Sequence, residues 1–312
     1  MPTIPAPTNS AVGTSPPTLI AMAGATGDLG HRIALALLDR GAQVRALVRP
    51  GNRKPELDEL RTRGAEIVEV DFTSVAALAK ACAGAACVVS ALSGLRSVIV
   101  DTQARLLDAA VAAGVPRFIP SDYSIDFTKL PEGSNRNLDL RREFGRRLDQ
   151  APIQATSVLN GMFMDLLTGQ APVVLANIRR VLYWGSANQP LDFTTIADTA
   201  AFTAAAALDP TTPRYLRVAG EVATVRDLQA AASAATGRRF GRLRAGRLWL
   251  LQLLIKIARR LAPAPGEVFP AWQGMQYLHN MFTGRPKLTP LDNDRYPEIR
   301  WTKVREVLAA PH

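Results

Sequence analysis

Short apolar runs alternate with helix-like segments over the first half of the chain. The apolar runs predict strands at residues 18–24, 42–48, 66–70, 86–92, 117–122 and 154–159. Helical patterns lie between them, near residues 29–40, 74–83, 97–113 and 135–147. Strands separated by helices of this length form a parallel sheet with right-handed crossovers. The first half therefore predicts a doubly wound α/β fold.

The regular alternation weakens near residue 160. Residues 160–167, 190–208 and 224–237 predict strand fragments and helices without the earlier repeat. We expect residues 18–160 to form the α/β domain, and residues 161–312 to form a smaller α/β lobe with segments that cross back to the sheet. Residues 1–17 are rich in Pro, Thr and Ser and lack the basic start and apolar run of a signal peptide. They predict a disordered leader on a cytoplasmic protein.

The stretch RLWLLQLLIKIARRLA (residues 247–262) is apolar over much of its circumference and charged at both ends. It is too short and too interrupted to span a bilayer, so no transmembrane segment is expected. Basic ends and an apolar middle suit a helix on an anionic membrane surface. The simpler explanation is a helix packed in the second lobe or at a subunit contact, and this is what we expect.

The charge of the chain bears on which binding partners we expect. The chain carries 37 Lys+Arg against 27 Asp+Glu, a formal charge of +10, and arginine dominates. Arginine suits phosphate and carboxylate recognition, although a GC-rich genome explains its abundance equally well. The arginines are scattered and no aromatic–basic platform accompanies them, so we expect no specific nucleic-acid binding. Cys82 and Cys87 resemble small buried hydrophobes, and no metal site is expected from the cysteines and histidines.

The strongest chemical signal is AMAGATGDLGHRI (residues 21–33). Gly24, Gly27 and Gly30 directly follow the first predicted strand and open the first helix, which is the context of a dinucleotide site. Gly24 permits the tight turn, Gly27 lets the backbone approach a pyrophosphate, and Gly30 brings the helix against the strand. The helix N-terminus offers free N–H groups and the positive end of its dipole to phosphates. The same loop contributes Thr26, Asp28 and Leu29 to the predicted site.

The end of the second strand indicates which dinucleotide binds. NAD sites usually place an acidic residue about twenty positions after the glycine loop, where it accepts hydrogen bonds from the ribose. Here Arg49 takes that position and is followed by Arg53 and Lys54. A carboxylate would repel a 2′-phosphate, whereas this basic cluster would neutralise it. The sequence therefore favours NADP(H) over NAD(H), with Arg49 and Lys54 as ligands and Arg53 in a solvated loop.

Several motifs together resemble the NmrA-like and isoflavone-reductase-like group of atypical short-chain dehydrogenases. They are GATGDLG, the LVR strand end, VEVDFTS (68–74), VVSALSG (88–94), GVPRFIPSDYS (114–124) and SVLNGMFMD (157–165). The resemblance runs from about residue 18 to 170, and it implies an NAD(P)-binding Rossmann-like fold. It places Asp71 and Phe72 beside the adenine, Ser90, Ala91 and Leu92 along the cofactor, and Asn160, Gly161 and Phe163 near the nicotinamide end.

The catalytic residues depart from the patterns of that group. The general short-chain dehydrogenase pattern needs Tyr-x-x-x-Lys, but Tyr123 is followed four residues later by Phe127. Isoflavone-reductase-like enzymes resemble one another in a lysine on the helix before the QATSVL-type strand, and apolar spacing places Arg141 at that position. Arginine does not readily donate a proton, because its pKa lies above about 12, but it can hold a developing oxyanion. Arg141 and Tyr123 are therefore the catalytic candidates, with Ser121 and Lys129 as further proton donors.

The arginine-rich helix predicts which guanidinium faces the cofactor. Leu140, Phe144 and Leu148 form an apolar stripe at i, i+4 and i+8. Arg141 flanks that stripe, and a structural ion pair explains it as well as a ligand contact. We expect Arg142 and Arg146 to point away into solvent.

Two functions are compatible with these features. One is an NADPH-dependent oxidoreductase that reduces a small carbonyl, quinone or enone by hydride transfer. The other is a non-catalytic NADP sensor that acts through a protein partner. We favour the oxidoreductase, and either function permits a homodimer.

Overall fold

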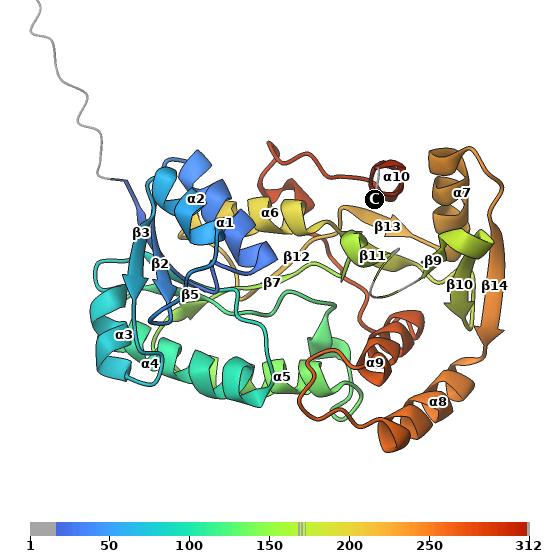
Figure 1. Cartoon of the computed structure of the whole chain (residues 1–312), viewed down its shortest axis with the longest axis horizontal. Coiled ribbons are helices and arrows are strands. Elements are labelled where there is room, and N and C mark those ends of the chain that lie inside the picture. The colour runs from blue at the N-terminus through green and yellow to red at the C-terminus, as the bar shows by residue number, and fades with distance from the viewer. Residues whose placement is uncertain (1–16, 168, 170, 172, 311–312) are drawn as a thin grey trace, which may run out of the picture.

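The computed structural model describes residues 17–167, 169, 171 and 173–310 (Figure 1). Residues 1–16 of the predicted leader lie outside the described residues. Six parallel strands form the main sheet in the order β3-β2-β1-β4-β5-β6, which is the strand order of dinucleotide-binding folds. They are β1 Leu19–Ala23, β2 Gln43–Val48, β3 Glu66–Glu69, β4 Cys87–Ser90, β5 Arg117–Ile119 and β6 Gln154–Ala155. The prediction of a doubly wound α/β fold is confirmed.

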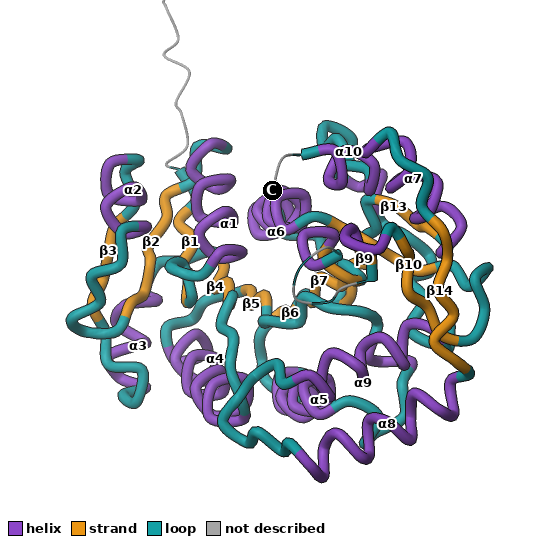
Figure 2. Tube along the Cα trace, turned by 45° about the vertical axis from the view of Figure 1, so that its right-hand side comes forward, coloured by secondary structure: helices purple, strands orange, loops and turns teal. Residues whose placement is uncertain are grey.

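Helices cover both faces of the main sheet (Figure 2). One face carries α1 Asp28–Asp39, α2 Glu56–Thr62 and α6 Ile196–Leu208; the other carries α3 Val75–Cys82, α4 Gln103–Ala112 and α5 Arg136–Leu148. A π-helical turn, Ser97–Thr102, leads into α4. Because both faces are covered, the central strand β1 is buried almost throughout, as parallel strands usually are. Helix α2 was not predicted, because its apolar positions Leu57 and Leu60 are too few to show a period.

Several helices have a polar N-cap residue. Its side chain accepts a hydrogen bond from a backbone N–H of the first helical turn. Ser74 does so for α3 and Asn135 for α5. Thr224 begins α7 (Val225–Thr236) in a reciprocal capping box with Asp227. Such caps satisfy N–H groups that have no partner within the helix.

Three smaller sheets form the rest of the molecule (Figure 1). Their orders are β14-β10-β9, β13-β11-β8 and β12-β7. The strands are β7 Ser157–Leu159, β8 Met162–Phe163, β9 Val174–Leu175, β10 Arg180–Trp184, β11 Leu191–Thr194, β12 Tyr215–Arg217, β13 Glu221–Ala223 and β14 Gly241–Gly246. The remaining helices are α8 Leu248–Leu261, α9 Ala271–Phe282 and α10 Val304–Ala309, with short 3-10 turns at Phe127–Lys129, Met164–Leu166, Ala176–Ile178 and Asn293–Arg295.

Two features join the later segments to the main sheet. The predicted strand 154–159 splits at Thr156 into β6, which pairs with β5, and β7, which pairs with β12. Helix α6 lies against α1 on the main sheet, and Ile33 and Leu37 of α1 share a buried cluster with Phe202 of α6. The division near residue 160 stays a prediction, since the core of the main sheet includes residues from beyond it.

Candidate cofactor and active site

The glycine loop lies between β1 and α1, where it packs against the chain that follows β4. Gly24 has φ +90°, and a Cβ there would come within 2.6 Å of the Ala91 carbonyl oxygen. A Cβ on Gly30 would come within 2.1 Å of the Gly24 carbonyl oxygen. At Gly27, by contrast, a Cβ would meet only the Gly24 oxygen, at 3.5 Å. Gly24 and Gly30 are therefore required by packing, whereas the Gly27 backbone is open on the side where a ligand would approach.

The amino end of α1 is available to an anion. Gly27 is the N-cap residue and contributes no side-chain hydrogen bond to the first turn, so the N–H groups at Asp28 and Leu29 have no side-chain cap. A residue of the loop after β2 also contacts the glycine loop, because Lys54 Nζ donates a hydrogen bond to the Thr26 carbonyl oxygen at 3.2 Å. An uncapped helix N-terminus beside a lysine is suited to a phosphate.

The three basic residues after β2 differ in their partners. Arg53 pairs with Glu69 at 3.0 Å, and this hydrogen bond, together with the Gly51 N–H, holds the pKa of the Glu69 carboxyl below its usual value. Arg49 is exposed, and no carboxylate pairs with it among the residues that the structure describes. Arg49 is thus the guanidinium of this loop that remains available to an external anion.

Asp71 and Phe72 follow β3, at the same edge of the sheet. The Asp71 carboxylate accepts hydrogen bonds from Thr73 N and Thr73 Oγ1, both at 2.8 Å, and these bonds lower the pKa of Asp71. The Phe72 carbonyl oxygen accepts from Arg105 Nε at 3.0 Å. Arg105, on α4, fixes the position of this segment; nothing in its sequence context indicates that role.

Two buried polar side chains at the carboxyl ends of strands have no protein partner. Ser90 ends β4, and its Oγ makes no hydrogen bond. Asn160 directly follows β7, and neither its Oδ1 nor its Nδ2 has a partner. Both residues are completely buried, where unpaired polar atoms cost free energy. Polar atoms at the carboxyl ends of parallel strands face the position of a bound nucleotide in such folds, so both residues fit a cofactor.

The other residues predicted to line the cofactor are held in place by contacts within the protein. Leu92 accepts a hydrogen bond from Ser121 Oγ at 2.6 Å through its carbonyl oxygen. Gly161 has φ +71°, and a Cβ there would lie 2.3 Å from the Asp192 carbonyl oxygen. Phe163 packs beside the buried cluster beneath α6. Gly161 is therefore a glycine because β11 approaches it closely, whatever its role toward the cofactor.

Arg141 lies on the buried side of α5. Its Nη1 donates to the Asn137 carbonyl oxygen at 3.1 Å, whereas its Nε is buried and has no partner. Burial raises the pKa of the nearby Asp122 carboxyl, while a hydrogen bond from Ser157 and the charge of Arg141 act in the opposite direction. Asp122 is completely buried, accepts from Ser157 Oγ at 2.6 Å, and leaves Oδ1 unpaired. Arg141 thus lies close enough to Asp122 for its charge to favour the ionised carboxyl, and its Nε has no hydrogen-bond partner.

Tyr277 on α9 also lies near Arg141. Burial raises the pKa of its phenol, and the charges of Arg141 and Arg136 counteract that rise. No sequence signal could have indicated this pair, because the two helices lie far apart along the chain and share no motif.

Tyr123, one of the candidate proton donors, lies in the core of the protein. Its side chain lies in the apolar cluster that contains Phe202 of α6, on the opposite face of the sheet from α5. Its hydroxyl is buried without a partner, and burial raises the pKa of the phenol strongly. The structure does not bring Tyr123 and Arg141 together, so Tyr123 is poorly placed as a proton donor. Ser121 bonds to Leu92, and Lys129 Nζ donates to the Lys287 carbonyl oxygen at 2.7 Å.

The prediction that Arg142 points into solvent is wrong. Its Nη2 donates to the carbonyl oxygens of Phe127 and Leu130, at 2.6 and 2.8 Å, and its Nη1 pairs with Asp139 at 2.7 Å. The cause is the segment before α5, which folds over this side of the helix. Arg146 is exposed as predicted and pairs with Glu132.

Arg142→Ala should lower the free energy of unfolding by about 2–3 kcal/mol, because it removes three hydrogen bonds of a charged group and leaves the Leu130 carbonyl oxygen without its donor. Arg146→Ala is the matched control on the same helix and should change stability by less than about 0.5 kcal/mol. Urea unfolding of the two variants measures the difference. Equal stabilities would show that the Arg142 contacts contribute nothing.

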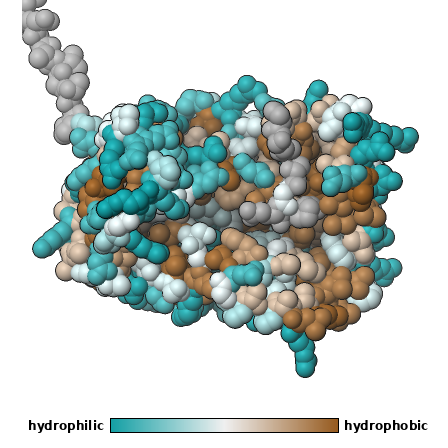
Figure 3. Space-filling model, in the orientation of Figure 1, coloured by the Kyte–Doolittle hydropathy of each residue, from teal (hydrophilic) through white to brown (hydrophobic). Residues whose placement is uncertain are grey.

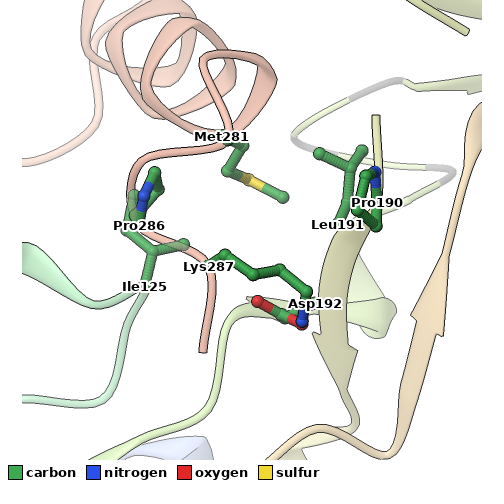
Figure 4. A pocket seen from close by; sticks show the side chains of 8 residues that line it. Ile125, Pro190, Leu191, Asp192, Met281, Pro286 and Lys287 are labelled. Carbon is green, nitrogen blue, oxygen red and sulfur yellow. The ribbon is translucent and has the colours of Figure 1, made fainter. Parts of the chain in front are cut away.

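Large apolar side chains of the segments after β7 belong to the core and do not line an open pocket. Met162, Met164 and Trp184 lie in one buried cluster. A small hollow nearby lies between β11 and the loop after α9, where Lys287 pairs with Asp192 (Figure 4). Its cavity of about 10 Å³ holds one water molecule at most. This hollow is too small for a substrate.

The two cysteines are buried residues of the core. Cys82 and Cys87 are buried and free, as predicted, and burial raises their thiol pKa values to about 11 and about 12. Within the described part of the chain, no group of three or more His, Cys, Asp or Glu side chains could hold a metal ion. No helix there is long and apolar enough to cross a membrane.

Comparison with known proteins gives relatives along most of the chain. The model of the NmrA-like family matches residues 16–275. Pinoresinol reductase 1 of Arabidopsis thaliana is 31% identical over 211 residues, which cover 62% of this chain and 66% of that protein. A bifunctional pinoresinol-lariciresinol reductase of Linum perenne is 24% identical over 322 residues, which cover 94% and 98%.

Solved structures share the fold over nearly the whole length. A structure described as AtPrR2 with NADP+ and (+)pinoresinol has a TM-score of 0.76 at 22% identity and covers 95% of this chain and 99% of its own. A structure of isoflavone reductase has a TM-score of 0.78 at 20% identity, with coverage of 94% and 99%. The family match spans the glycine loop, α5 and the later segments as far as residue 275, in α9. The chain belongs to the NmrA-like family.

Proposed function

We propose that this protein binds NADP(H) and acts as an NADPH-dependent reductase on a small molecule. One observation carries the proposal: the open Gly27 backbone lies at the same edge of the sheet as two buried, unpaired polar residues, Ser90 and Asn160. A bound nucleotide would satisfy these atoms and the uncapped end of α1. Two relatives with solved structures support this reading, since AtPrR2 is described with NADP+ and leucoanthocyanidin reductase with NADPH.

Arg141 is proposed to act on the substrate. The bound cofactor would supply a hydride to an electrophilic carbon of a carbonyl, quinone or enone. The negative charge then develops on oxygen, where the positive charge of the Arg141 guanidinium can stabilise it. A water molecule would supply the proton, because arginine stays protonated and Tyr123 is buried on the other face of the sheet.

Cofactor consumption tests the reductase proposal. The purified chain with NADPH should lose the cofactor's absorbance when it meets a member of a carbonyl, quinone and enone panel. Tight NADP(H) binding without turnover across that panel would instead support the NADP-sensing alternative. Absence of binding would contradict both.

Arg49 should select NADP(H) over NAD(H). Arg49→Ala removes the free guanidinium of the β2 loop and should weaken NADP+ binding by about tenfold, the value of one charge-assisted contact, while NAD+ binding stays nearly unchanged. Arg49→Asp should weaken NADP+ binding further, because a carboxylate repels the 2′-phosphate. Calorimetry measures both affinities.

Arg53→Ala is the control within the same loop. Its guanidinium already pairs with Glu69, so its loss should affect NADP+ less than the loss of Arg49. Equal affinities of the parent protein for NADP+ and NAD+ would contradict the assignment of Arg49.

A further inference from the structure

Helix α8 carries apolar residues on two of its faces. Leu251 and Ile255 are buried on the inner face, which packs on α9, and Arg259 lies 5.5 Å from the Trp272 ring centre. The outer face carries Trp249, Leu253, Ile257 and Leu261, which are 62%, 46%, 45% and 79% exposed. We call these four residues the outer stripe. The expectation of a packed helix therefore holds for the inner face alone.

The outer stripe is continuous because its members recur every four residues, which places them along one side of a helix. In Figure 3 hydrophobic surface gathers at the lower right, where Figure 1 places α8. Leu254 and Phe269 are further exposed large apolar residues in this region. Apolar residues gathered in this way on a protein surface usually mark an interaction site.

The charge on and around α8 is mostly positive, and the exposed Glu267 is the first carboxylate after the helix. Residues 228–266 contain no aspartate or glutamate and eight basic residues: Arg238, Arg239, Arg242, Arg244, Arg247, Lys256, Arg259 and Arg260. All eight are exposed, and none forms an ion pair with another described residue. Lys256 and Arg260 lie three residues beyond Leu253 and Ile257, so they border the stripe along the helix. The partner of this surface must therefore supply both apolar contact and negative charge.

A second copy of the chain does not fit that requirement. A twofold contact through α8 would bring the Lys256 and Arg260 side chains of both copies together, since such an interface uses the same patch twice. Within residues 228–266 no carboxylate could compensate them, and each copy would bring only Glu267 from directly beyond this range. Like charges held together in this way oppose association.

We propose that the outer stripe and its flanking cations dock on an anionic lipid surface. A helix of this composition lies in the plane of the interface, with its apolar side chains among the headgroups and upper acyl chains. Trp249 would occupy the interfacial region that tryptophan favours. The long side chains of Lys256 and Arg260 can reach the phosphates from beside the stripe.

Vesicle flotation with the full chain tests the charge requirement. Vesicles of phosphatidylcholine mixed with phosphatidylglycerol should bind the protein, and pure phosphatidylcholine vesicles should bind it much less. Lys256→Gln with Arg260→Gln should weaken binding by about tenfold or more, because each cation near an anionic surface contributes appreciably. Lys80→Gln with Arg305→Gln removes the same charge from α3 and α10, at exposed residues without ion pairs, and should weaken binding far less.

A second pair of double variants tests whether membrane binding needs the apolar side chains of the outer stripe. Trp249→Ser with Ile257→Ser should also reduce binding by about tenfold or more, whereas Ile178→Ser with Val222→Ser alters exposed apolar residues elsewhere and should leave binding nearly unchanged. Trp249 is the most exposed of the four tryptophans, so its fluorescence should shift to the blue with anionic vesicles. Circular dichroism during heating confirms that each variant is folded.

Three outcomes would overturn the proposal. The first is no binding to anionic vesicles, and the second is equal loss in the α8 and control charge variants. The third is a dimer in sizing experiments that dissociates in Trp249→Ser with Ile257→Ser, without vesicle binding. That result would assign the outer stripe to self-association.

Discussion

Gly27→Val should abolish NADP(H) binding and leave the fold intact. A Cβ at Gly27 meets only one protein atom, the Gly24 oxygen at 3.5 Å, so the protein itself can accommodate a side chain there. The added branched group would instead occupy the space above the uncapped end of α1, where a pyrophosphate must approach. Loss of two charge-assisted hydrogen bonds corresponds to a decrease in affinity of about a hundredfold or more. Calorimetric titration with NADPH measures it.

Gly30→Ala is the informative comparison for that experiment. Its Cβ would lie 2.1 Å from the Gly24 carbonyl oxygen, so this smaller change should destabilise the protein while Gly27→Val does not. Thermal unfolding separates the two variants. Parental NADPH affinity in folded Gly27→Val would show that Gly27 is not at the phosphates, and the proposed position of the cofactor would then fail.

Arg141→Ala should lower turnover by about a hundredfold or more, the usual effect of losing one group that stabilises an oxyanion. NADPH affinity should change little, because Arg141 lies on α5 and not at the glycine loop. Arg141→Lys keeps a positive charge beside the buried Asp122. It therefore tests the need for a guanidinium while the Asp122 carboxyl still has a neighbouring cation. We expect Arg141→Lys to retain or raise activity, since lysine is the residue of the resembling reductases.

Arg142→Ala controls for damage to α5 in the same experiments. It should destabilise the helix through its lost contacts with the segment before α5, yet leave turnover per folded molecule nearly unchanged. If Arg141→Ala and Arg142→Ala lose turnover equally, α5 acts only through its stability. The catalytic role of Arg141 would then be withdrawn.

The glycine loop was predictable because its requirements are local. The turn at Gly24, the open backbone at Gly27 and the close approach at Gly30 all arise within seven residues and one strand–helix junction. The same holds for the main sheet, whose buried strands are short apolar runs bounded by helices. Local pattern therefore sufficed for the fold class, and the phosphate end of the candidate site stays a prediction.

The surroundings of α5 were not predictable in the same way. Gln273 Nε2 donates to Asn135 Oδ1 at 2.6 Å, across 138 residues of sequence, and Tyr277 approaches Arg141 from the same distant helix. The apolar spacing of α5 indicated its buried side but not the segment 127–130 that covers Arg142. Such contacts depend on how separate segments pack against one another. The pattern of apolar residues within one helix cannot predict that packing.

Arg117 has a consequence for how the chain folds. This buried residue of β5 donates to the carbonyl oxygens of Ala206 and Ala207 at the end of α6 and to Thr212 Oγ1, at 2.7–2.8 Å. A fragment ending near residue 160 would leave this guanidinium without those acceptors and would expose the side of α1 that α6 covers. We therefore expect the main sheet to reach its full stability only after the later half of the polypeptide has been synthesised. During translation, the amino-terminal half would emerge first as an incomplete and aggregation-prone intermediate.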